Sequence, residues 1–220
     1  MTSRRKQRQS KVERGVKPIT AKTLNQKDYI ISIIENDITF CCGPAGSGKS
    51  FISAGIAANH LHKGQVDTVI VTRPLVCTGK DIGALPGELQ EKIAPYLGPM
   101  QENIKFFLGQ SLYGHYNNER RLRYEPLEVM RGATFHDSYM ILDEAQNCTF
   151  EQIKMFITRM GKNSKIIING DINQSDIRGS SGLEHCMDRL EGVLGVGVCE
   201  LTREDIQRNG ILGRVLEALE

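Results

Sequence analysis

The chain has 220 residues, of which 40% are hydrophobic and 25% are charged, and its formal net charge is +2. This composition is typical of a globular protein with one substantial core, and six cysteines without a C-x-x-C pair argue against a zinc finger or a disulfide framework. No apolar run approaches the ~18 residues of a membrane span and no apolar segment follows the charged start, so we expect a soluble, cytoplasmic protein with no membrane partner.

Basic residues are concentrated at the start of the sequence. Residues 1–17 contain seven Lys or Arg and a single acidic residue, and they are poor in apolar side chains. We therefore expect residues 1–19 to form a flexible basic tail and residues 20–220 to form one domain. Such a tail is either a solvated terminus or a segment that attracts polyanions such as nucleic acid, and the sequence leaves both interpretations open.

The first predicted elements surround a glycine-rich loop. A β-strand is predicted over 37–42 and a helix over 49–64, and the sequence between them fits the pattern G-x-x-x-x-G-K-[ST]. In that pattern the backbone amides and the start of the helix surround the phosphates of a nucleotide. Because the pattern alone is short, the strand–loop–helix order is what makes a nucleotide site the preferred interpretation. The predicted binding residues are Gly43, Pro44, Ala45, Gly46, Ser47, Gly48, Lys49 and Ser50.

Further apolar runs predict the rest of a sheet. Strands are expected over 66–72, 138–144 and 164–171, with a weaker one over 196–201, and helical patterns separate them. Alternating strands and helices, with strands apolar on both faces, predict an α/β three-layer sandwich with a mostly parallel sheet, as in P-loop NTPases. Residues 73–137 are rich in Gly, Pro, Tyr and Arg and are predicted to be the least regular region.

Polar residues follow two of these predicted strands. In P-loop enzymes Lys49 would reach the β and γ phosphates, Ser50 and Asp143 would hold Mg²⁺, and Glu144 would polarise the attacking water. The alternative is that the two acids merely cap the next helix. Gln174 follows the strand at 164–171, where its amide would sense the γ phosphate or simply belong to a turn.

Several longer segments carry a resemblance to a known family. They are CGPAGSGKS, TRP, IGALPGELQEKIAPYLGP, MRGATFHDSYMILDEAQNCTFEQIKMFITRMG, NGDINQSDI, SGL and REDIQRNGILGRVLEAL. Together they resemble the PhoH family of P-loop ATPases over about residues 20–220. The resemblance implies a RecA-like core related to the motor domains of superfamily 1 helicases, ATP hydrolysis with Mg²⁺, and action on RNA.

The same resemblance implies roles for three residues outside the loop. Gln26 matches a glutamine that reads the adenine, Gln174 matches a γ-phosphate-sensing glutamine, and Arg208 matches the arginine of a late family pattern. Family members commonly follow that arginine with His-Pro or a similar pair, whereas Asn209 and Gly210 follow it here.

An arginine is also needed if neighbouring copies share a site. Helicase motors place ATP between two RecA-like units, one of which supplies an arginine that stabilises the transferred phosphoryl group. Hexameric rings are known in the PhoH family, and the resemblance therefore implies a homohexamer in which each subunit supplies an arginine finger to its neighbour's site. Arg208 is the first candidate for this arginine, and Arg203 and Arg178 are the next candidates. The alternative is a structural arginine that pairs with Glu204 or Asp205.

The segment after the second predicted strand carries Arg73, Lys80 and Lys92. In helicase-like cores the matching segment faces the nucleic-acid strand, whereas the alternative is an ordinary surface excursion. We therefore expect an ATPase coupled to single-stranded RNA or DNA. The alternatives are a nucleotide-gated assembly module with slow hydrolysis and, less favoured, a small-molecule kinase.

Overall fold

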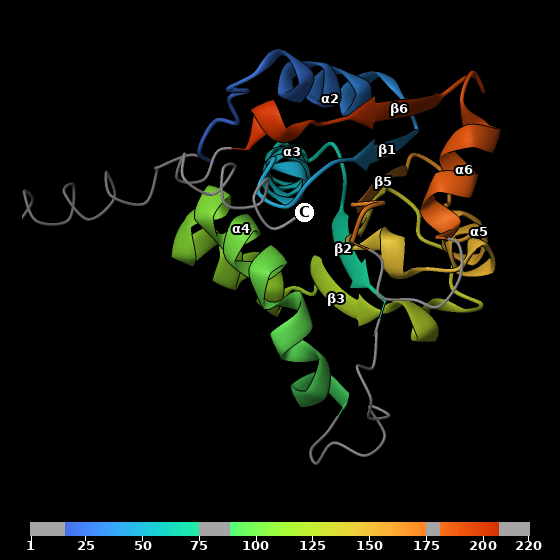
Figure 1. Ribbon diagram of the computed structural model, residues 1–220. Coiled ribbons are helices and arrows are strands. Elements are labelled where there is room, and N and C mark those ends of the chain that lie inside the picture. Colours follow the sequence, from blue (N-terminus) through green and yellow to red (C-terminus); the bar gives the residue numbers. More distant parts are fainter. Residues whose placement is uncertain (1–15, 75–88, 175–180, 207–220) are drawn as a thin grey trace, which may run out of the picture.

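The computed structural model describes residues 16–74, 89–174 and 181–206, with side chains of 89–95 excepted. Within these residues the chain forms one six-stranded sheet whose strand order is β3-β2-β4-β5-β1-β6, and each neighbouring pair runs parallel (Figure 1). The predicted α/β fold is confirmed. The strands are β1 (Ile38–Cys42), β2 (Thr68–Arg73), β3 (Leu122–Pro126), β4 (Ser138–Leu142), β5 (Lys165–Gly170) and β6 (Val196–Glu200).

Helices cover both faces of this sheet. The residues of β4 alternate between two hydrophobic clusters: Tyr139 and Ile141 belong to one, whereas Met140 and Leu142 belong to the other. The first cluster is completed by α2 (Leu24–Glu35), α3 (Lys49–His62) and α4 (Leu89–Asn118), and the second by α5 (Phe150–Ile157) and α6 (Gly182–Leu190). The result is the predicted three-layer sandwich. Short 3₁₀ helices lie at Leu127–Met130, Ala145–Asn147 and Arg203–Asp205.

Local signals explain where several helices begin and end. The Thr23 side chain accepts a hydrogen bond from the Gln26 amide at the start of α2, and Thr149 and Gln152 form a capping box at the start of α5. The Lys165 ammonium group donates to three carbonyls at the end of α2, where a cation also favours the helix dipole. Burial lowers the pKa of this lysine.

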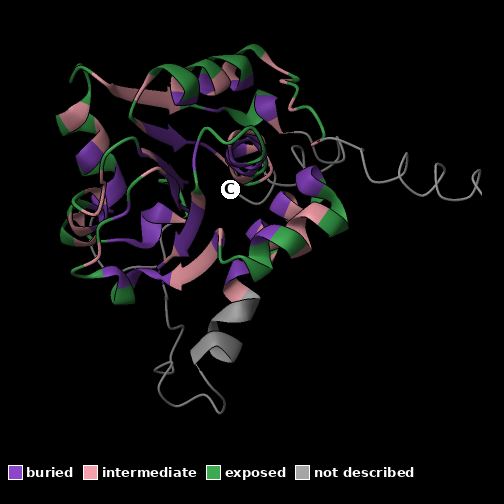
Figure 2. Ribbon diagram, turned by 180° about the vertical axis from the view of Figure 1, so that it is seen from behind, coloured by how far each residue is buried: buried purple, intermediate pink, exposed green. Residues whose placement is uncertain are grey.

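The region expected to be least regular contains a helix and a strand. The sequence of α4 includes Gly98 and Pro99, and the helix is interrupted at Gly109, where φ is 74°. Strand β3 lies at the edge of the sheet, and only its two terminal residues are buried (Figure 2). Its sequence, LRYEP, contains two charged residues and lacks the continuous apolar run by which the central strands are recognised, which is why the sequence patterns did not predict it.

The register of the sheet brings the predicted site together. Cys42 at the end of β1 lies beside Gly170 at the end of β5, and β5 in turn pairs with β4. The loop after β1, the acids after β4 and the residues after β5 therefore meet at one edge, where parallel α/β sheets bind ligands. In the part of the chain that is described, no helix is both long and apolar enough to cross a bilayer.

Candidate nucleotide site

The loop after β1 depends on glycine at two positions. A Cβ atom on Gly43 would lie 2.4 Å from the Leu201 carbonyl oxygen, so no larger residue fits between β1 and the chain after β6. Gly48 precedes the first residue of α3 with a φ of 100°, in the left-handed region that glycine adopts without strain. The two glycines that define the sequence pattern, Gly43 and Gly48, are thus each required by the local structure.

Lys49 begins α3 and turns its side chain back over the loop. Its ammonium group donates hydrogen bonds to the carbonyl oxygens of Gly43 and Pro44, the latter at 2.9 Å, and the side chain is largely buried. The positive charge lies next to the amino end of α3, whose free amides also favour an anion. This arrangement suits the phosphates of a nucleotide.

Ser50 and Asp143 face each other across the same edge. The Ser50 hydroxyl donates to the Asp143 carboxylate at 2.8 Å. Burial of Asp143 raises its pKa, the adjacent Glu144 charge adds to the rise, and the Ser50 hydrogen bond and the Arg73 and Lys49 charges oppose it. A buried carboxylate of this kind gains from a cation beside it.

The Ser50–Asp143 pair fits magnesium. Mg²⁺ prefers oxygen ligands and is usually held by one or two protein groups, with water and substrate phosphates completing the octahedron. No group of three or more His, Cys, Asp or Glu side chains that could hold a metal occurs among the described residues. A two-residue site completed by a nucleotide is consistent with that finding.

Glu144 lies at the turn out of β4 with a φ of 56°, in the left-handed region. It occupies the N-cap position of a 3₁₀ helix, but its side chain makes no capping hydrogen bond. Its carboxylate instead contacts Arg73, with 3.1 Å between Nη2 and Oε1, and accepts a hydrogen bond from Gln146 at 2.6 Å. Gln146 also accepts a hydrogen bond from the Asp171 amide at 3.0 Å, which ties the end of β4 to the end of β5.

Gln174 closes a short turn after β5. Its backbone amide donates to the Asp171 carbonyl at 3.0 Å, and its side chain is exposed. Gln174 therefore does belong to a turn, which was the alternative interpretation of this segment, and the turn lies at the carboxyl edge of the sheet. Sensing of the γ phosphate by Gln174 stays a prediction.

Gln26 is buried beside the loop rather than exposed. Its amide nitrogen donates to the Ser47 carbonyl at 2.8 Å, and its amide oxygen accepts from the Lys22 amide at 2.9 Å. Nearby, the Asp205 carboxylate accepts hydrogen bonds from Thr23, Asn25 and Thr202. Gln26 thus holds the loop against the start of α2, and its reading of adenine stays a prediction.

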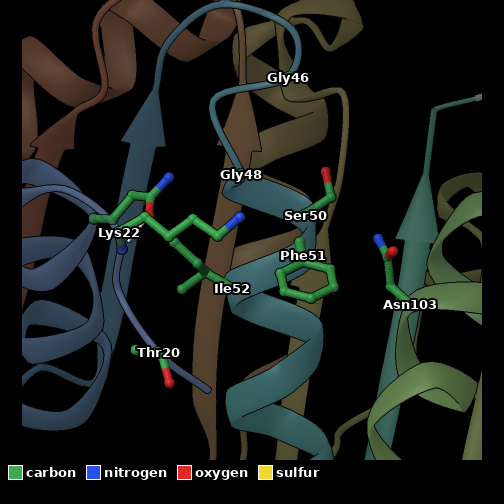
Figure 3. A pocket seen from close by; sticks show the side chains of 9 residues that line it. Thr20, Lys22, Gly46, Gly48, Ser50, Phe51, Ile52 and Asn103 are labelled. Atoms are coloured by element: carbon green, nitrogen blue, oxygen red, sulfur yellow. Dashed lines mark hydrogen bonds between the residues drawn. The ribbon is translucent and has the colours of Figure 1, made fainter. Parts of the chain in front are cut away.

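A pocket of about 380 Å³ opens between the loop, α3 and α4 (Figure 3). Thr20 and Lys22 approach it from the segment before α2, Phe51 from the first turn of α3, and Asn103 from α4. Its size and its position beside the phosphate loop suit a nucleoside. The lining residues are Thr20, Lys22, Gln26, Gly46, Gly48, Ser50, Phe51, Ile52 and Asn103.

Phe51 is the main residue of this pocket that the sequence analysis missed. Its ring packs against Phe107 of α4, with 4.6 Å between centroids, yet 39% of the residue is exposed. The approach of the two helices is close, because a Cβ atom on Gly55 would lie 2.7 Å from the Phe107 ring. The sequence feature that could have identified Phe51 was its position directly after Ser50, because a residue in the first turn of the helix lies close to a ligand bound by the loop.

The remaining predicted residues are only partly described. Arg208, Arg178, Lys80 and residues 1–15 lie outside the described residues, as does the Lys92 side chain. Arg203 is exposed in the last 3₁₀ helix. At the end of the basic segment, the Lys17 amide donates to the Phe107 carbonyl at 2.9 Å, and its ammonium group lies 3.5 Å from the centroid of the Phe106 ring.

Comparison with known proteins identifies the family. The family model described as "PhoH-like protein" matches residues 18–220. The chain belongs to the PhoH family. It is 39% identical over 206 residues to the PhoH-like protein of Bacillus subtilis and 40% identical over 209 residues to Protein PhoH of Escherichia coli K12. Each match covers 93% of this PhoH-family chain, but only 65% and 59% of the relatives' own lengths.

Solved structures show a related fold. The large terminase of a thermophilic bacteriophage superposes with a TM-score of 0.54, over 91% of this PhoH-family chain and 50% of the terminase. The structure of the same terminase in complex with ADP also superposes with a TM-score of 0.54, over 89% of this chain and 49% of the terminase. At 12% and 10% sequence identity, this likeness concerns the fold alone.

Proposed function

We propose that this PhoH-family chain is a magnesium-dependent ATPase. The observation that carries the proposal is the meeting of Lys49, the 2.8 Å Ser50–Asp143 pair and Glu144 at one edge of the sheet. Asp143 and Ser50 would hold Mg²⁺, which neutralises charge on the phosphate oxygens when it is bound. The pocket lined by Phe51 and Gln26 would hold the nucleoside.

The chemical step assigns one task to each side chain. The Glu144 carboxylate accepts a proton from a water molecule, whose oxygen bonds to the γ phosphorus. The bond from that phosphorus to the β–γ bridging oxygen breaks, and its electron pair leaves with ADP. The Lys49 ammonium group stabilises negative charge on the β and γ phosphates. Gln174 contacts the γ phosphate, and Gln26 contacts the adenine.

We further propose that hydrolysis is coupled to single-stranded RNA or DNA. The seven basic residues of 1–17 and the helicase-like character of the family support this coupling. The test measures ATP turnover of the full chain with and without single-stranded RNA and DNA, with Lys49→Ala as the inactive control. Stimulation by nucleic acid supports the proposal.

Two other outcomes of that test would contradict the proposal. Slow turnover that neither nucleic acid changes favours a nucleotide-gated assembly module, and phosphoryl transfer to an added small molecule favours a kinase. A chain that lacks residues 1–15 tests whether the tail contributes to nucleic-acid binding. Each phosphate contact that is lost makes the affinity for nucleic acid less dependent on salt. An unchanged salt slope would make the tail an ordinary solvated terminus.

We also propose that active sites form between copies in a ring, with Arg208 as the arginine supplied by a neighbour. Support comes from the family and from the motor arrangement, in which ATP lies between two RecA-like units and this chain supplies one. Arg208→Ala and Lys49→Ala, each inactive alone, should regain partial activity when mixed. Absence of recovery despite demonstrated subunit exchange, or full activity of a monomer, would contradict a shared site.

A further inference from the structure

Arg73 and Glu144 come from the ends of neighbouring strands. Thr72 of β2 pairs with Leu142 of β4, and the Asp143 amide donates to the Thr72 carbonyl at 3.0 Å. The register of the sheet therefore places Arg73, the last residue of β2, beside the turn that carries Glu144. The ion pair between them follows from the fold, although the two residues are 71 positions apart in the sequence.

The pair holds the side chain of the proposed water-activating residue. The guanidinium of Arg73 lies 3.1 Å from one carboxylate oxygen of Glu144, and Gln146 donates to the other at 2.6 Å. Both oxygens are thus engaged by protein groups. Glu144 also has a backbone conformation that non-glycine residues rarely adopt, which the surrounding contacts must hold in place.

Arg73 also connects this acid to helix α4. Its second terminal nitrogen donates to the Tyr96 carbonyl at 3.0 Å. Both charged side chains are partly exposed, at 26% for Arg73 and 37% for Glu144, so an anion from solution can reach the pair. An ion pair at this exposure is weak, because water screens it and both side chains lose freedom in making it.

We infer that Arg73 is a positioning residue that holds Glu144 in a resting orientation, and that a nucleic-acid phosphodiester releases Glu144 by taking over the Arg73 guanidinium. A guanidinium binds phosphate through two parallel hydrogen bonds, as it binds a carboxylate, so the two anions compete for the same donors. The inference rests on the proposed ATPase function. It explains how binding at this edge changes the rate of hydrolysis.

The main test replaces Arg73 in the full chain. Arg73→Ala should raise the turnover number without nucleic acid by up to about fivefold, the factor that corresponds to a weak exposed ion pair. Stimulation by single-stranded RNA or DNA should fall to about onefold, since there is no pair left to release. The KM for ATP should stay close to the wild-type value, because Arg73 does not line the nucleotide pocket.

Two further variants make the test specific. Arg73→Gln keeps a donor for the Tyr96 carbonyl but removes the charge, so it should behave as Arg73→Ala does even if the alanine variant folds poorly. Arg123→Ala is the matched control, because Arg123 forms a similar partly exposed pair with Glu125 on the neighbouring strand β3, with 2.8 Å between Nε and Oε1. The control should retain both the wild-type basal rate and the wild-type stimulation.

The possible failures are distinguishable. A fall of the basal turnover number in both Arg73 variants, with ATP affinity unchanged, would overturn the inference and make Arg73 a group that supports the reaction directly. Wild-type basal rate and wild-type stimulation in both variants would also overturn it, while leaving the ATPase proposal intact. A wild-type chain that does not hydrolyse ATP with or without nucleic acid would refute the proposed function itself.

Discussion

The two ends of the proposed nucleotide site, which we call the phosphate end and the base end, are built in different ways. At the phosphate end, the loop follows β1, Asp143 and Glu144 follow β4 on the other side of β5, and Ser50 lies in the first turn of α3. At the base end, the pocket is assembled from the segment before α2, from α3 and from α4. The register of the strands positions the residues of the phosphate end, whereas the packing of the helices positions the residues of the base end.

Two buried aspartates, Asp143 and Asp205, also differ between the two ends of the site. Burial raises the pKa of Asp143 at the phosphate end, as expected for a carboxylate prepared for a cation. At the base end burial also acts to raise the pKa of Asp205, but hydrogen bonds from Thr23, Asn25 and Thr202 outweigh it and lower the pKa. Asp205 is satisfied by the protein itself, so it stabilises the fold, whereas Asp143 is suited to a ligand.

The largest effect should follow from Glu144→Gln at the phosphate end. The amide cannot accept the proton of the attacking water, so we expect the turnover number to fall by at least ~100-fold. Binding of ATP should be retained, because Glu144 does not line the pocket. Single-turnover kinetics together with ATP titration measure both quantities.

Lys49→Ala provides the contrast for that variant, since it should lose ATP affinity as well as turnover. If Glu144→Gln hydrolyses ATP at the wild-type rate, another group activates the water, and the assignment of the phosphate end must change.

The next effect concerns stability at the base end. Asp205→Asn replaces a carboxylate that accepts several hydrogen bonds by an amide whose NH₂ group faces donors, so we expect a loss of about 2 kcal/mol. For a chain of this size that corresponds to about 4–8 °C in Tm. Thermal melting at pH 7 measures the change, and Glu204→Gln, an exposed neighbour, is the control.

The pH dependence of this effect has a definite sign. Because the folded state lowers the pKa of Asp205 below its usual value of 3.8, the ionised group stabilises the fold fully above that value. The contribution is lost as the pH falls through the lower, folded-state pKa. The difference between wild type and Asp205→Asn should therefore shrink below about pH 4, and a difference that persists there would argue that shape rather than charge is responsible.

The smallest effect should come from Phe51→Ala in the base pocket. Loss of an aromatic stacking surface is worth roughly 1–2 kcal/mol, so ATP and ADP should both bind about tenfold more weakly. The turnover number at saturating ATP should change little, because the interaction is the same before and during the reaction. Fluorescence titration with a labelled nucleotide measures the affinities.

Phe51→Tyr keeps the ring and should restore the affinity. If Phe51→Ala binds nucleotide as tightly as wild type, the nucleoside lies elsewhere, and the pocket beside the loop has another ligand.

The sequence by itself determined the phosphate end of this site. Gly48, Lys49 and Ser50 are consecutive, and Asp143 and Glu144 directly follow a buried strand, so local patterns and the rule that parallel strands end at one edge were sufficient to group them. The five predicted strands were confirmed. Four of them are interior strands whose residues are mostly buried and form continuous apolar runs, whereas the fifth, β6, lies at an edge of the sheet without a buried residue and gave the weaker signal. The edge strand β3 has no such run and was missed.

The tertiary structure alone decided the base end and the contacts of Glu144. Phe51 and Asn103 line one pocket because α3 packs against α4, and Arg73 meets Glu144 because β2 lies next to β4. These pairings depend on strand order and helix packing, which join residues far apart in the chain. Local periodicity reports which face of an element is buried, but not which element will cover it.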